Sequence, residues 1–179
     1  MSAETWTIDS THTSIGFTVR HMVVAKVRGR FTSFEGSIAL TDGRVPGAEV
    51  KIDAASIDTQ VAARDEHLRS ADFFDVANHP AITFRASSIE QKGERVRLSG
   101  DLTLHGVTRP VEIEGEFYGK MVDPFGTERI AFSARTRLDR KDYGLTWNQA
   151  VEAGGVLVGD RIDIELEVQA VKAAATEAA

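Results

Sequence analysis

The stretch RIDIELEVQA, residues 161–170, alternates apolar and polar side chains without a break. Its even-numbered positions are Ile, Ile, Leu, Val and Ala, and Asp, Glu and Glu lie between them. A period of two over this length is that of a β-strand with one buried and one solvated face. Half-solvated strands are typical of antiparallel sheets, because strands of parallel sheets are usually covered on both faces. The stretch therefore predicts an antiparallel β protein.

The same alternation recurs along the chain. It is clear in PVEIEGEFYG (110–119) and RIAFSARTRL (129–138), and weaker in SIGFTVR (14–20), EVKIDA (49–54), AITFRAS (81–87) and RVRLSGDLTLH (95–105). Turn residues separate these runs, the strongest being Asp42-Gly43, a pair that favours a two-residue β-hairpin. About eight to ten strands with short connections predict a closed barrel or a sandwich. In the run 30–40, Phe31 and Phe34 differ in parity, which predicts either a bulge between them or one outward-facing ring.

The solvated faces of three of these strands carry charges of alternating sign. Acidic residues occupy 112–116, arginines 135–137 and acidic residues again 163–167. If these strands are neighbours in that order, acid faces base across both pairings, which favours that register. The alternative is a solvated face with no particular pairing.

One short helix is predicted after Thr59, which can serve as its N-cap. Asp65 and Arg69 are four residues apart in the favourable acid-first order. Asn78-His79-Pro80 then ends the segment, because a residue before proline disfavours helical dihedral angles. The fold class is thus all-β with one short helix.

Composition limits the function classes. The chain has 179 residues, 42% hydrophobic and 27% charged, with a net charge of −6 and no cysteine. This balance predicts one soluble domain and disfavours nucleic acid as a partner. No run approaches the ~20 apolar residues of a membrane-spanning helix. The first residues lack the basic and apolar regions of a secretory signal, so the cytoplasm is the expected location; a chain trimmed of its leader, periplasmic or secreted, would have the same sequence.

The stretch ARDEHLRSADFFDVANHP, residues 63–80, gathers carboxylates and histidines, but its spacing matches neither a zincin helix nor an EF-hand loop. A metal held by His67 and His79 with Asp72 or Asp75 stays an alternative to a polar helix and turn. Signatures of α/β-hydrolases, P-loop proteins and dinucleotide-binding enzymes are missing. We therefore expect no catalytic residues, no resident metal and no cofactor.

Several separated motifs resemble the YceI-like family, the polyisoprenoid-binding, lipocalin-like barrel proteins of bacteria. They are WTIDSTHTSIGFTVRHM (6–22), VRGRFTSFEGSI (27–38), SIDTQVAARDEHLRSADFFD (56–75), HPAITFRAS (79–87), GDLTLHGVTRPV (100–111), RKDYGLTW (140–147) and VGDRIDIELEVQA (158–170). Thr13 departs from the pattern, because it stands between a His and a Ser that are often adjacent in the family. The resemblance implies an extended antiparallel barrel of about eight strands around a hydrophobic tunnel. It further implies a long-chain isoprenoid, quinone-like or fatty-acid-derived ligand, a homodimer and no catalytic residues.

Residues 1–171 are expected to form this single domain and residues 172–179 a flexible tail. Parity along the strands, together with Trp147 near a strand end, predicts the lining of the tunnel. The predicted lining residues are Ile15, Phe17, Val19, Phe34, Phe84, Leu102, Leu104, Val111, Ile113, Phe117, Phe132, Trp147, Ile164 and Leu166. Arg20, His21, Arg140 and Trp147 are the predicted residues of its mouth. The leading hypothesis is lipid binding for transport, storage or stress protection. The alternatives are a metal-dependent hydrolase that uses the 65–79 cluster and a filled barrel that serves in protein interactions.

Overall fold

The computed structural model describes residues 3–152 and 154–174. Over these residues the chain forms strands, one α-helix and three 3-10 turns. In chain order the elements are β1 (Glu4–Ile8), η1 (Ser10–His12), β2 (Ser14–His21), β3 (Ala25–Phe31), β4 (Phe34–Thr41), β5 (Arg44–Asp53), η2 (Ala54–Ser56), β6 (Ile57–Asp58), α1 (Ala62–Arg69), β7 (Ala81–Lys92), β8 (Arg95–Leu104), β9 (Val107–Val122), β10 (Glu128–Asp139), η3 (Arg140–Tyr143) and β11 (Val158–Lys172). Lys172, the first residue of the predicted tail, thus belongs to β11, and residues 175–179 lie outside the described residues.

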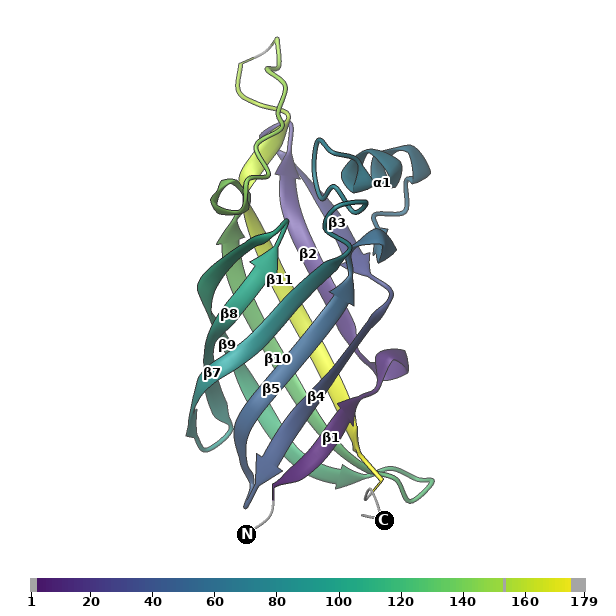
Figure 1. The fold of residues 1–179 in the computed structure, drawn as a ribbon, viewed down its shortest axis with the longest axis vertical. Coiled ribbons are helices and arrows are strands. Elements are labelled where there is room, and N and C mark those ends of the chain that lie inside the picture. The colour runs from purple at the N-terminus through teal and green to yellow at the C-terminus, as the bar shows by residue number, and fades with distance from the viewer. Residues whose placement is uncertain (1–2, 153, 175–179) are drawn as a thin grey trace.

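Eight strands close into an antiparallel barrel in the order β1–β4–β5–β7–β8–β9–β10–β11, and β11 returns to pair with β1. The first part of β11 pairs with β2, which carries β3 and β6 beyond it. Figure 1 shows an elongated barrel with α1 at one end and the two chain termini at the other. The predicted fold class, a closed antiparallel barrel with one short helix, is confirmed.

Local turn chemistry sets the register of the hairpins. Asp42 and Gly43 have φ angles of 49° and 75°, so they form the predicted two-residue turn between β4 and β5. His105 and Gly106 form a similar turn between β8 and β9, with φ angles of 53° and 73°. Two successive positive φ angles match the right-handed twist of the flanking strands, which is why such short turns are tolerated.

β10 pairs with β9 on one side and β11 on the other, which is the strand order that the charge pattern favoured. Arg135 of β10 lies opposite Glu114 of β9 and Glu165 of β11. Arg137 lies opposite Asp163, and its Nε donates to the Asp163 carboxylate at 2.6 Å. On the outer face, the arginines of β10 therefore lie opposite acidic residues of β9 and β11.

Two predictions about where elements begin and end were wrong. Thr59 is not the N-cap of α1: Val61 holds that position, and no side chain caps the helix. Phe31 and Phe34 do not belong to one strand, because Phe31 ends β3 and Phe34 begins β4. A corner between two strands, rather than a bulge, lets both rings pack inward despite their different parity.

Buried side chains form two clusters along the barrel. The first is centred on Trp6, Leu40, Phe117 and Ile130, from β1, β4, β9 and β10. The second contains Ile15, Phe31, Ile57, Phe73, Ile82, Leu104, Tyr143 and Leu145, drawn from strands, from the segment after α1 and from η3. We call the parts of the barrel around these clusters the filled half and the hollow half, since the cavity described below borders the second cluster. Among the described helices, none has the length and apolar character needed to cross a bilayer.

Candidate ligand-binding site

An apolar cavity of about 220 Å³ lies inside the hollow half of the barrel. Its walls are aliphatic and aromatic side chains from the inner faces of the strands, and the few polar residues at its boundary include Thr136, Arg140 and Tyr143. Alternation places these apolar side chains inside, because each strand sends every second residue to the same face. An apolar space with few polar groups can hold an apolar ligand without leaving buried polar atoms unpaired.

Most of the predicted lining residues border this cavity. They are Ile15, Phe17, Val19, Phe84, Leu102, Leu104, Val111, Ile113, Ile164 and Leu166. The remaining predicted residues lie elsewhere. Phe117 and Phe132 stack in the filled half with ring centroids 4.6 Å apart, and Phe34 packs between the two clusters. Trp147 packs on the rings of Phe73 and His67, at centroid distances of 5.2 and 4.7 Å.

The structure adds lining residues that the predicted set lacked. Ile52, Ile82 and Ile162 have the correct parity on their strands, so the sequence carried a signal for them. Phe73, Phe74, Tyr143 and Leu145 also border the cavity, but they lie outside the strands, where no period of two marks them. The segments that contain these four residues reach the cavity only through tertiary packing.

Arg140 closes one side of the cavity end. Its side chain is only 4% exposed, and it donates to the backbone carbonyls of Leu145, Trp147, Val158 and Gly159 at 2.7 to 3.3 Å. Burial lowers the pKa of Arg140 from its ordinary value, while Asp160 and Asp139 act in the opposite direction. Its guanidinium thus joins the loop after η3 to the start of β11. Of the other predicted mouth residues, Trp147 packs beside the cavity end, whereas Arg20 and His21 lie on β2 outside the lining.

The segment of α1 and the residues that follow it close the other side. Asp65 of α1 is buried and accepts hydrogen bonds from the Thr59 backbone N–H at 2.9 Å and the Thr59 hydroxyl at 2.6 Å. Arg69 does not pair with Asp65 as predicted: it donates to the carbonyls of Ala55 and Ile57. These contacts hold α1 against the barrel, and Leu68, Phe73 and Phe74 extend from this segment to the cavity. We call residues 68–74 the lid segment.

The two histidines of residues 65–79 lie in separate groups. His67 Nε2 lies 2.8 Å from the Asp72 carboxylate, and its ring packs edge-on against Phe73. His79 instead lies near Asp75 and near His105, a residue from the β8–β9 turn. The predicted combination of His67 with His79 is therefore not assembled.

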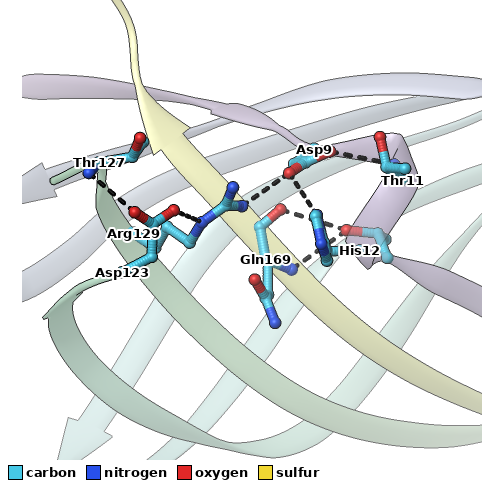
Figure 2. A network of polar contacts seen from close by, with 8 residues as sticks. Asp9, Thr11, His12, Asp123, Thr127, Arg129 and Gln169 are labelled. Carbon is cyan, nitrogen blue, oxygen red and sulfur yellow. Dashed lines mark hydrogen bonds and ion pairs between the residues drawn. The ribbon is translucent and has the colours of Figure 1, made fainter. Parts of the chain in front are cut away.

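A polar network lies on the outside of the filled half (Figure 2). Arg129 of β10 donates to the carboxylates of Asp9 at 2.6 Å and Asp123 at 2.9 Å, and His12 Nδ1 lies 2.8 Å from Asp9. The Arg129 guanidinium, followed by His12, holds the pKa of Asp9 well below its usual range. This network fastens the β1–β2 connection to β10 and stands away from the cavity.

The fold and the cavity together define a small antiparallel β-barrel with an apolar interior site. Residues 6–170 match the model of the YceI-like domain, so the chain belongs to the YceI-like family. A UPF0312 protein of Vibrio cholerae is 37% identical over 164 residues, covering 90% of this chain and 82% of that protein.

Solved structures share the fold. The YCEI protein of Campylobacter jejuni is 26% identical with a TM-score of 0.75, covering 87% of this chain and 90% of that one. A domain from Saccharophagus degradans, described as a polyisoprenoid-binding domain implicated in plant cell wall breakdown, is 16% identical with a TM-score of 0.68. That match covers 94% of this chain and 98% of the other.

Proposed function

We propose that the chain binds a long-chain isoprenoid or a related amphiphilic lipid in the hollow half of its barrel, as a carrier rather than as an enzyme. The observation that carries this proposal is the apolar cavity of about 220 Å³ enclosed by strands, lid segment and η3 loop. The shared fold with a domain described as polyisoprenoid-binding supports it. Transport, storage or stress protection would be the purpose of such a carrier.

The energetics of an apolar cavity suit such a ligand. Each buried CH₂ group contributes about 0.8 kcal/mol, so about ten buried carbons contribute roughly 8 kcal/mol before the costs of association. The cavity of about 220 Å³ is smaller than the roughly 300–1,000 Å³ usual for ligand sites. A long chain therefore has to displace side chains of the lining or extend past the lid segment. The lid segment and the η3 loop are the elements at the cavity end whose movement would admit it.

The test begins with protein purified without denaturation, extracted with organic solvent and analysed by mass spectrometry. A stoichiometric lipid in the extract, or saturable uptake of a fluorescent prenyl probe, is expected. The absence of both would overturn the proposal.

A matched pair of leucines on β8 locates the site. Leu102 borders the cavity, while Leu98, four residues away on the same face, packs in the filled half. Leu102→Trp should weaken uptake of the probe at least tenfold, because the indole occupies the ligand's space. Leu98→Trp should leave uptake within about twofold and instead lower the free energy of unfolding by roughly 1–3 kcal/mol through overpacking. Equal uptake by the two variants would show that the cavity is not the site.

A further inference from the structure

Asp75, His79 and His105 form a compact group beside the lid segment. One ligand-type atom from each side chain lies within 4.8 Å of the other two, and the two imidazole rings have centroids 4.8 Å apart. Asp75 and His79 come from the connection between α1 and β7, whereas His105 comes from the β8–β9 turn. Figure 1 shows α1 and the end of β8 at the same end of the barrel. Residues 26 or more positions apart are thus brought together by the tertiary fold.

His105 has the hydrogen bond of a metal-ligating histidine. Its Nδ1 lies 3.0 Å from the backbone carbonyl oxygen of Tyr143. A carbonyl oxygen can only accept, so Nδ1 carries the proton, and in the neutral ring Nε2 keeps its lone pair. Metal-binding histidines are usually oriented in this way, with the ring nitrogen that does not bind the metal donating to a carbonyl or carboxylate.

The backbone holds the other two side chains in place. The His79 and Asn78 N–H groups both donate to the Asp75 carbonyl, at 2.8 and 3.0 Å, and the Asn78 side-chain amide donates to the Asp75 carboxylate at 2.9 Å. Asp75 has a φ angle of 46°, a conformation that few non-glycine residues adopt. At Gly106, an added Cβ would lie 2.7 Å from His79 Cε1. Glycine at this position therefore leaves the room that the His79 ring occupies.

We propose that Asp75, His79 and His105 bind a divalent transition metal ion, with Zn²⁺ as the best match. Two imidazoles and a carboxylate are ligands that zinc accepts, and three protein ligands leave a fourth tetrahedral position for water. Bonds of about 2.0–2.1 Å place the ligand atoms of a tetrahedral site roughly 3.4 Å apart, so the group closes on the ion through small side-chain rotations. All three residues are half-buried, which leaves the ion a path from solvent.

The ion would have a structural role and not a catalytic one: it would hold the lid segment against the barrel wall, and we call this arrangement the clasp. Phe73 and Phe74 of the lid segment border the cavity and precede Asp75 directly, and Leu104 of the lining directly precedes His105. A bond from each side to one ion ties the lid segment to the barrel wall at the cavity end. Its consequence, slower exchange of the bound ligand, rests on the proposed lipid-binding function, whereas the metal site does not.

The metal site is tested with the full chain, free of any histidine tag and treated with EDTA. Titration with Co²⁺ should give the visible absorption of a tetrahedral site with one ion per chain, and Zn²⁺ should displace it. His79→Gln and His105→Ala should each weaken Zn²⁺ binding at least tenfold by calorimetry. His67→Ala is the matched control, because His67 pairs with Asp72 in the same region, and its affinity should equal that of the wild type. Circular dichroism checks that each variant is folded.

Failure of the wild type to bind one ion, or equal affinity of the folded His79→Gln variant, would overturn the metal site. The clasp is tested by the rate at which the prenyl probe leaves the protein. Zn²⁺ should slow this release at least threefold in the wild type and leave it unchanged in His79→Gln. An unchanged rate in zinc-bound wild type would overturn the clasp. Failure of the probe to bind at all would count against the proposed function and not against the metal site, which is measured without lipid.

Discussion

The filled and hollow halves of the barrel share several strands, among them β8 and β9, but their interiors differ. On the inner face of β9, Phe117 stacks against Phe132 in the filled half, while Ile113, four residues away, borders the cavity. Trp6 and Ile130 are fully buried beside the stacked pair. Phe117 and Phe132 face each other on the neighbouring strands β9 and β10, so their rings stack inside the filled half. The cavity also has aromatic rings in its walls, among them Phe17, Phe74 and Phe84. The way in which inward side chains meet, rather than the presence of aromatic rings, therefore distinguishes the packed interior from the cavity.

The two halves are also closed by different chemistry. At the filled half, Arg129 joins Asp9 and Asp123 through ion pairs on the outer surface. At the hollow half, Arg140 is buried and bonds to backbone carbonyls of the loop after η3 and the start of β11. The contacts of Arg129 depend on the negative charge of two carboxylates. The contacts of Arg140 depend on the planar guanidinium, whose five N–H donors can reach several carbonyl oxygens at once.

The two halves should differ most in the free energy of unfolding that is lost when an aromatic ring is removed. Phe117→Ala should lower the free energy of unfolding by about 3–5 kcal/mol, because Phe117 is 6% exposed and belongs to the buried cluster of the filled half. Phe84→Ala should cost about 2 kcal/mol or less, since Phe84 is half-buried and already borders empty space. Urea unfolding followed by fluorescence and circular dichroism measures both. Equal losses would mean that the hollow half is packed as tightly as the filled one.

Arg140→Lys should lower the free energy of unfolding by about 2 kcal/mol, which is a smaller effect. The structural loosening should be confined to the hollow half. A lysine keeps the charge but cannot reproduce the fork of the guanidinium, so carbonyls of the η3 loop lose their donors. We expect faster hydrogen exchange at the start of β11 and faster release of the prenyl probe. Exchange in β1 and β4, which belong to the filled half, serves as the internal control. A uniform rise in exchange over the whole barrel would contradict this assignment.

The smallest expected effect is on the stability of the fold at acidic pH. Lys120 and Lys172 lower the pKa of Glu4 from 4.5 to about 2, and Arg129 lowers that of Asp9. Both groups bind fewer protons in the fold than in the unfolded chain, so their stabilisation is present above about pH 4.5 and is lost as the pH falls toward 2.

Both carboxylates lie at the filled half, where Arg129 also lowers the pKa of Asp123. At the hollow half the pKa of Asp58 is lowered as well, mainly by the hydrogen bond from the Gln60 backbone N–H. The larger part of the slope of stability with pH in this window should therefore come from the filled half. Asp9→Asn should lower the melting temperature at pH 7 and flatten its fall in acid. Asp101→Asn, at a position in β8 outside the network of Figure 2, is the control and should leave the slope unchanged. A slope unaffected by Asp9→Asn would assign the acid sensitivity to other carboxylates.

Much of the fold could be predicted from the sequence because it depends on neighbouring residues. Alternation in residues 161–170 and 129–138 predicted strands, and the turn at Asp42-Gly43 predicted a hairpin. The α1 region was harder, since the contact of Asp65 with Thr59 runs backward from the helix and replaces a cap. Ten of the predicted lining residues border the cavity, but parity also selected Phe117 and Phe132, which lie in the filled half. Phe73, Phe74, Tyr143 and Leu145 were missed, because they reach the cavity from turns and loops.

The sequence by itself determined that alternate strand residues point inward and that the interior is apolar, and it favoured, through opposite charges, one order of three strands. Only the tertiary structure decided how deep along the barrel each inward residue lies. Leu98 and Leu102 have the same parity and the same side chain, yet one packs in the filled half and the other borders the cavity. It also decided that His79 meets His105 rather than His67. A period of two predicts which face of a strand a residue lies on. The position of that residue along the barrel and the residues that it contacts depend on the tilt of the strands and on segments distant in sequence.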